Sequence, residues 1–241
     1  MLASGLALGL ASGLAWLWLA TSGNMSGDHM TMMMVEPWSG AYLWPAFIMW
    51  ALMMVAMMLP SATPMVLLHA KLDRSPSSGH RLLHTLLFGL SYLLVWAAFS
   101  ALAAALQATL IDAGLLSAAT LELGDRRIAG ILLLVAAAYQ LSGAKAACLD
   151  QCRSPIHFVM RYWRPGPAGA LRLGVIHGLY CLGCCWALML LLFAGGVMNL
   201  AWVAALAVIV SLEKWSPAHW RAGLIVAAAL AIAGVALLVT G

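Results

Sequence analysis

One stretch of the chain carries side chains that bind soft metal ions. His177, Cys181, Cys185 and Met189 recur at every fourth position, with Cys184 between them. A spacing of four places side chains along one slowly drifting face of a helix. Thiolate and thioether ligands select Cu(I) over harder ions, and imidazole also suits copper. The pattern predicts a soft-metal site whose ligands are His177, Cys181, Cys184 and Cys185.

These cysteines allow two other interpretations. Cys181 and Cys184 form a C-x-x-C pair, which can cycle between dithiol and disulfide. Cysteine also packs as a small apolar residue in protein cores. We favour the metal site because three thiols and a histidine lie together in an apolar segment, where polar groups are costly and usually functional.

The whole chain has the composition of a membrane protein. It has 241 residues, of which 64% are hydrophobic and 8% charged, and its mean hydropathy is +0.97. A soluble domain carries roughly 25% charged residues. The net charge of +4 is too small to indicate nucleic-acid binding, and five cysteines do not suggest a disulfide scaffold. We find no P-loop, nucleophile elbow or dinucleotide fingerprint that would indicate an enzyme.

We expect an all-α bundle of about seven transmembrane helices, forming one membrane domain over residues 1–241. A span needs roughly 20 apolar residues at a rise of 1.5 Å each. The sixth apolar run is short and follows the fifth across Gly195-Gly196-Val197, which predicts a tight hairpin or a re-entrant loop. The first run lacks the basic start of a signal peptide, so we expect a retained helix. The runs cover residues 2–20, 43–69, 85–106, 127–143, 173–195, 198–212 and 222–240.

Basic residues alternate between the predicted loops. Ten of the twelve Lys and Arg residues fall near 70–84, in 144–172 and in 213–221. The opposite loops, 21–42 and 107–125, carry acidic residues and no Lys or Arg. By the positive-inside rule the N-terminus is cytoplasmic and the C-terminus outside.

Methionines supply a second set of soft donors. Eleven of the fifteen fall between positions 25 and 65. In the outer loop, His29 and Met30 belong to a Met-rich segment of the kind that captures copper without a thiolate. The second span continues the pattern, although methionine is also a common gap-filler in cores. Its candidate ligands are Met53, Met54, Met57 and Met58.

Depth in the membrane relates these methionines to the cysteines. Met53 and Met54 lie about 16 Å below the outer edge of their span, and Cys181 lies about 14 Å above the inner edge of its own. Met57 and Met58 are similarly level with His177. Thioethers and thiols therefore meet at mid-membrane if the two helices face one another. Pro60 and Pro64 should kink the second span and free backbone carbonyls.

A third group of donors lies in the cytoplasmic loop 144–172. Cys148 and Cys152 are four residues apart, so they share a helix face at the cytoplasmic mouth. Nearby Lys145 and Arg153 would favour the thiolate form. This pair suits the handover of Cu(I), or it is simply two free cysteines on a surface helix.

Other ionisable groups are interpreted as structural or solvated. His69 and His84 fall in or beside basic inner loops, where solvent would reach them. Glu213 and Lys214 end the sixth span, and we interpret them as interfacial anchors rather than site residues.

Three stretches carry a family resemblance, namely residues 57–62, 139–155 and 178–200. With these motifs the chain is similar, over residues 45–215, to bacterial integral membrane proteins classed as predicted metal-binding, a domain family of unknown function. The resemblance implies metal binding in a membrane but assigns no reaction. The methionines, the Tyr139-Gln140 pair and the cysteines named above fall on the family's motifs.

The sequence therefore predicts an inner-membrane protein that binds a soft metal ion, most readily Cu(I), for transport or delivery. Its partners would be the lipid bilayer, the ion, and a metalloenzyme or metallochaperone, but not nucleic acid. Two alternatives stay open at this point. One is a thiol–disulfide oxidoreductase using Cys181 and Cys184, and the other is a non-catalytic assembly subunit of a membrane complex.

Overall fold

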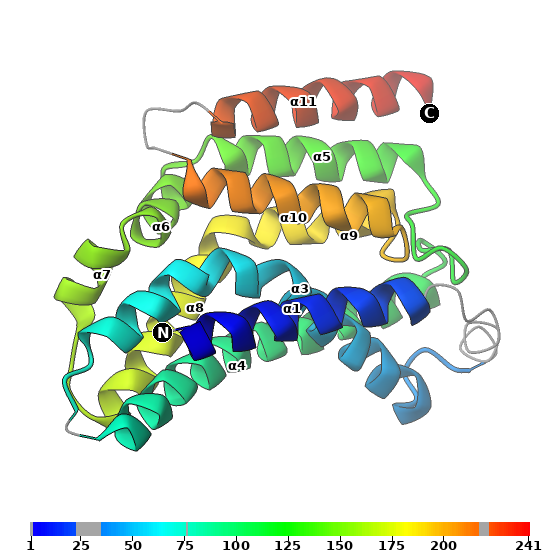
Figure 1. Cartoon of the computed structure of the whole chain (residues 1–241). Helices are drawn as coiled ribbons and strands as arrows, with labels where there is room; N and C mark the ends of the chain where they lie inside the picture. Colours follow the sequence, from blue (N-terminus) through cyan, green and yellow to red (C-terminus); the bar gives the residue numbers. More distant parts are fainter. Residues whose placement is uncertain (1, 23–34, 76, 217–221) are drawn as a thin grey trace.

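The computed structural model describes residues 2–22, 35–75, 77–216 and 222–241. Within these ranges the chain is helical and contains no β-strand, which confirms the predicted all-α class (Figure 1). The helices are α1 (Leu2–Ser22), α3 (Gly40–Leu72), α4 (Ser78–Asp112), α5 (Arg126–Gln140), α6 (Gly143–Arg153), α7 (Pro155–Tyr162), α8 (Pro167–Leu190), α9 (Leu192–Gly195), α10 (Leu200–Trp215) and α11 (Ala222–Thr240).

Four stretches of helix are long and apolar enough to cross a membrane: α3, α4, α8 with α9, and α11. A fifth candidate is the pair α5 and α6, which is bent by 64°. The predicted first and sixth spans correspond to α1, whose apolar part Gly5–Thr21 is shorter, and to α10, which has 16 residues. By length and composition, the described residues therefore support four or five of the seven predicted spans.

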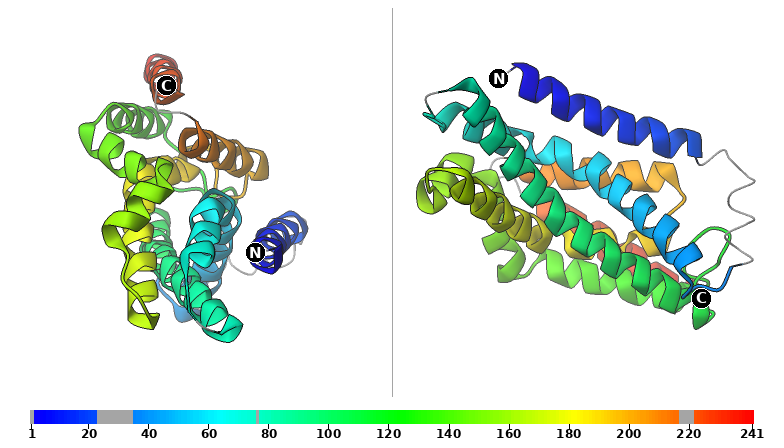
Figure 2. Two further views of the ribbon diagram at one scale, coloured as in Figure 1. Left: turned by 60° about the vertical axis from the view of Figure 1, so that its left-hand side comes forward. Right: turned by 90° about the horizontal axis from the view of Figure 1, so that it is seen from below.

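The helices form a bundle whose two ends differ. Figure 1 shows the N-terminus, α6, α7 and the connection from α3 to α4 at one end, and the C-terminus at the other. Packing pairs α4 with α8, α3 with α4, α5 with α11 and α1 with α3. Viewed along the bundle, α1 and α11 lie on different flanks of the central helices (Figure 2). The central helices α3, α4 and α8 therefore position the residues of interest.

Proline shapes α3 as the sequence predicted. Pro60 has no N–H group, so the carbonyl of Ala56 one turn earlier has no partner within the helix. Ser12 Oγ and Trp16 Nε1 of α1 both donate to this oxygen, each over 3.1 Å. The carbonyl freed by Pro60 thus becomes the polar contact that joins α1 to α3.

Glycines bring α8 close to two neighbours. A Cβ at Gly174 would lie 2.3 Å from the carbonyl oxygen of Phe88 in α4, and one at Gly178 would lie 2.9 Å from Val95. On its other side, a Cβ at Gly183 would lie 2.7 Å from Cys148 Sγ in α6. Small residues allow helices to approach this closely. Gly174 and Gly178 therefore form the face by which α8 packs against α4.

The connection from α8 to α10 is the tight hairpin predicted from the sequence. Gly196 has φ of +86°, a conformation that glycine adopts without a Cβ penalty. Asn199 caps α10 by accepting from the backbone N–H of Trp202, whose indole Nε1 donates to the carbonyl of Leu191 over 2.8 Å. This hairpin returns the chain so that the end of α10 reaches the middle of α8.

Candidate metal centre

Three thiols lie within about one turn of α8, inside the bundle. Cys181, Cys184 and Cys185 are each at most 2% exposed. The thiols of Cys184 and Cys185 both donate to the carbonyl oxygen of Cys181, over 3.1 and 3.0 Å. The three thiols also lie close enough to interact electrostatically with one another. The structure therefore places the predicted α8 cysteines together in the core.

Helix α6 adds its two cysteines to the same group. The thiol of Cys152 lies close enough to that of Cys184 for the two to interact electrostatically. Cys148 packs against α8 at Gly183, where a larger residue would collide with its sulfur. Both α6 cysteines are half-buried, whereas the α8 cysteines are fully buried. The α6 pair thus adjoins the α8 thiols, and we call the five cysteines together the thiol cluster.

A buried acidic residue holds α6 in this position. Glu213 of α10 pairs with Lys145 Nζ over 2.5 Å and accepts from Gln140 Nε2 over 2.8 Å. Arg153 Nε donates to the backbone carbonyl of Glu213 over 2.7 Å. Lys145 and Arg153 were predicted to favour the thiolate form of the α6 cysteines, but both contact Glu213 instead: the buried ammonium of Lys145 pairs with its carboxylate, and Arg153 donates to its backbone carbonyl. The prediction of Glu213 as an interfacial anchor is also wrong, since it is 2% exposed.

Lys214, the next residue, reaches the thiol cluster itself. Its Nζ donates to Cys181 Sγ and to Ser61 Oγ, each over 2.9 Å, and lies 3.9 Å from Met58 Sδ. Lys214 is buried, so its interpretation as an interfacial anchor is wrong as well. The physical reason is the hairpin before α10, which turns the end of that helix inward. The available signal was an acidic–basic pair directly after an apolar run, where charges are costly.

Met58 is the predicted thioether that the structure brings beside the cysteines. The hydroxyl of Tyr92 donates to the carbonyl of Met58 over 3.4 Å and lies 3.1 Å from Cys181 Sγ. From the sequence we expected Met58 to lie level with His177. That expectation counted helical rise from the span edges and took no account of helix tilt or of the prolines in α3. The remaining predicted methionines are buried in the same core: Met53, Met54 and Met57.

His177 lies one turn before Cys181, but its neighbours are aromatic. Its ring centroid is 5.4 Å from that of Tyr92, 6.0 Å from that of Phe88 and 5.4 Å from that of Phe158. The side chain is buried, yet Nδ1 has no hydrogen-bond partner among the described residues. His177 therefore offers a free nitrogen at the edge of the thiol cluster.

Two residues of the family motif contact the centre from α5. The hydroxyl of Tyr139 donates to the carbonyl of Gly183, and Gln140 bonds to Glu213. Tyr139 thus supports α8 between its cysteines, while Gln140 orients the carboxylate that holds Lys145. The motif contributes to the scaffold of the thiol cluster.

The donors do not form a rigid, ready-made metal cage. In the described part of the chain, no group of three His, Cys, Asp or Glu side chains is arranged to hold a metal ion. The thiols of Cys184 and Cys185 instead turn toward a backbone carbonyl. Their donor chemistry still fits Cu(I), because thiolates and thioethers are the ligands that select it. His29 and Met30, the predicted outer-loop donors, lie outside the described residues.

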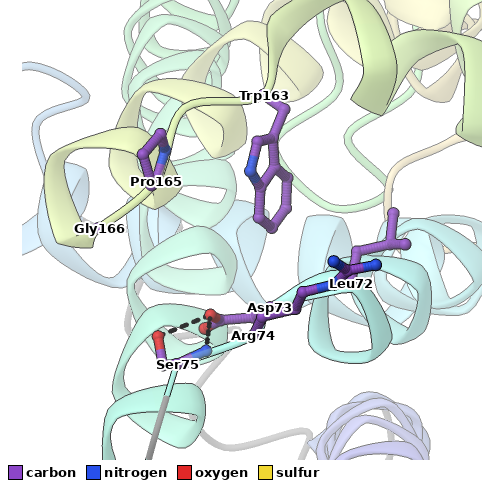
Figure 3. A pocket seen from close by; sticks show the side chains of 7 residues that line it. All are labelled: Leu72, Asp73, Arg74, Ser75, Trp163, Pro165 and Gly166. Atoms are coloured by element: carbon purple, nitrogen blue, oxygen red, sulfur yellow. Dashed lines mark hydrogen bonds between the residues drawn. The ribbon is translucent and has the colours of Figure 1, made fainter.

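A separate pocket of about 470 Å³ opens where α3 ends (Figure 3). Beside it, Asp73 accepts from Ser75 Oγ over 2.7 Å and pairs with His84 Nδ1 over 2.8 Å. The ring of His69 lies 5.4 Å from that of Trp163. His69 and His84 are buried, so the prediction that they are solvated is wrong: one stacks on aromatic rings and the other pairs with a carboxylate. The pocket is lined by Leu72, Asp73, Arg74, Ser75, Trp163, Pro165 and Gly166.

Comparison with known proteins yields one family. The model of the PpoB2 family, described as a copper chaperone, matches residues 47–237, a range that contains all five cysteines and Lys214. No curated protein and no solved structure matches the chain. Because the match covers most of the sequence, the chain belongs to the PpoB2 family of copper chaperones.

Proposed function

We propose that the protein binds Cu(I) in a bacterial inner membrane and delivers it to an acceptor. The thiol cluster is the holding site, and the observation that carries the proposal is the convergence of sulfur donors from α3, α6 and α8. Two helices contribute the five cysteines, and α3 contributes Met58. Membership of a copper chaperone family supports copper as the ion.

Cys181, Cys184 and Cys185 supply the core ligands in this proposal. They are buried together, and thiolates bind Cu(I) more strongly than oxygen or nitrogen ligands do. Met58 and His177 complete the donor set. Met58 lies beside the ammonium of Lys214, which in turn contacts Cys181. His177 lies one helical turn before Cys181, and its Nδ1 has no hydrogen-bond partner among the described residues.

The half-buried cysteines of α6 are proposed as the handover position. Cys152 lies beside Cys184, so Cu(I) would exchange one thiolate for another without leaving sulfur coordination. Cys148 and Cys152 are more accessible than the α8 cysteines, which suits contact with an acceptor. We place the α6 end of the bundle on the cytoplasmic side because the loops near it are basic.

Methionines are proposed to bring the ion to the cluster. His29 and Met30 would collect it in the outer loop, a role that rests on the sequence alone. Met53, Met54 and Met57 would then lead it along α3, since they are buried in the same core as the cysteines. Several helices are long enough to cross a bilayer, which supports a path through a membrane.

Metal analysis of protein purified anaerobically in detergent tests the holding site. We expect bound Cu(I) in the wild type and none after joint replacement of Cys181, Cys184 and Cys185 by Ser, because hydroxyls are poor ligands for a soft ion. Met58→Leu should weaken binding about fivefold, roughly 1 kcal/mol. Met160→Leu is its matched control, since Met160 is 78% exposed and outside the cluster. Full copper occupancy in the triple variant would refute the site.

A further inference from the structure

Lys214 carries the buried positive charge nearest to Cys181. Its three side-chain contacts are a thiol, a hydroxyl and a thioether. None of these groups is a carboxylate. The adjacent Glu213 already pairs with Lys145, and in the described residues no carboxylate lies within salt-bridge distance of Lys214. The ionisable groups that interact with its ammonium include Cys181, Cys184, Cys185, Tyr92, Cys152 and His177.

A charge in this environment needs compensation. Burying an isolated ammonium costs several kcal/mol unless an opposite charge lies beside it. Of the groups around Lys214, the thiols are the ones that become anionic when they coordinate a soft metal ion. Cu(I) bound by two thiolates is an anion with one negative charge, which the ammonium of Lys214 cancels. One thiolate would leave the site positive, and three would leave it negative.

We propose that Lys214 is the fixed counter-charge of a two-thiolate complex of a monovalent metal ion, with Cys181 as one of the two ligands. This inference rests on the proposed function. It adds to the same site a positively charged residue and a preference for the charge of the bound ion. It predicts preference by charge as well as by softness: the site favours the monovalent ions Cu(I) and Ag(I). Lys214 acts as a positioning residue, because it contacts the ligand thiol and not the ion's own coordination positions.

Hg(II) provides the discriminating probe. It is a soft ion that also binds two thiolates in a line, but its two-thiolate complex is neutral. Removing the ammonium should therefore weaken the binding of Cu(I) and Ag(I) and leave that of Hg(II) unchanged or tighter. At about 5 Å and an effective dielectric constant of about 20, the lost attraction corresponds to about a hundredfold in affinity.

The experiment measures all three ions by chelator competition on the detergent-solubilised full chain under anaerobic conditions. Lys214→Met should lose about a hundredfold for Cu(I) and Ag(I) relative to Hg(II), while Lys214→Arg should retain the wild-type ratio. Lys214→Gln carries the same expectation as Lys214→Met if the latter does not fold. Retained Hg(II) binding shows that the thiols are still in place.

The outcomes separate the counter-charge from the holding site. A selective loss of the monovalent ions supports the counter-charge. An equal loss for all three ions, or no loss of Cu(I), overturns it and leaves the thiol cluster intact as a copper site. Absence of Cu(I) binding in the wild-type protein would instead remove the proposed function and this inference with it.

Discussion

His177 and Cys181 lie one turn apart on α8 and are both buried, yet they belong to different regions. Around His177 the neighbours are the rings of Phe88, Tyr92 and Phe158. Around Cys181 they are the neighbouring thiols, the ammonium of Lys214 with Met58 beside it, and the hydroxyl rather than the ring of Tyr92. The spacing of residues on one helix placed both in a single stripe. The difference shows that the surrounding helices decide which part of a stripe becomes a soft-metal environment.

The largest effect that separates the two regions should come from their glycines. Gly174→Ala forces a Cβ to 2.3 Å from a backbone oxygen of α4, which cannot move aside, so we expect a loss of about 3 kcal/mol in unfolding free energy. Gly183→Ala meets the side chain of Cys148, which can rotate, so its stability loss should be smaller. Unfolding in mixed detergent micelles measures both.

The same two variants should rank in the opposite order when copper transfer from the thiol cluster is measured. Gly183→Ala displaces Cys148 and should slow copper transfer to an acceptor chelator, whereas any folded Gly174→Ala protein should transfer normally. If both variants transferred equally slowly, the two sides of α8 would not be independent regions.

His177→Phe tests whether the imidazole acts as a metal ligand of the thiol cluster or only packs in the aromatic region. Phenylalanine fits the aromatic neighbours, so the fold should be retained. Loss of the nitrogen donor should weaken Cu(I) binding about tenfold, or roughly 1.4 kcal/mol. Chelator competition measures the affinity. Unchanged affinity would assign His177 to the aromatic region alone and reduce the donor set to sulfur.

The smallest effect is expected outside both regions, at Asp73. Burial raises the pKa of its carboxyl, but hydrogen bonds from Ser75 and the contact with His84 lower it more, so the pKa lies below the ordinary value of 3.8. The resulting stability is present above that value and is lost as the pH falls through the lower, folded-state pKa. Asp73→Asn should therefore cost less than about 1 kcal/mol at neutral pH. In unfolding titrations, the difference from wild type should disappear in acid below pH 3.8. A difference that persisted there would assign the cost to packing.

The sequence predicted the parts of this molecule that depend on local pattern. Hydropathy identified the long apolar helices α3, α4, α8 and α11, Gly195 and Gly196 identified the hairpin, and Pro60 identified a freed carbonyl. The burial of Cys181, Cys184 and Cys185 on one helix followed from their spacing. Each of these features depends on residues close together in the chain, so periodicity and propensity are sufficient to find them.

The rest depends on contacts between distant segments. Lys214 is separated from Ser61 by 153 positions and from Cys181 by 33, and Glu213 is separated from Lys145 by 68. Helical periodicity carries no information on which helix the end of α10 will meet. The break between α5 and α6 has a local signal in Ser142, which caps α6, but the local sequence does not tell that the break returns Cys148 and Cys152 to α8. These residues could be suspected from their charge but not placed.

The contact between α1 and Ala56 has a consequence for how α1 is turned. Helix α1 is almost uniformly apolar, so lipid and protein could cover any of its faces at similar free energy. Only the face that carries Ser12 and Trp16 can donate to the oxygen left by Pro60. The N–H group that Pro60 lacks in α3 thereby determines how α1 is rotated about its own axis.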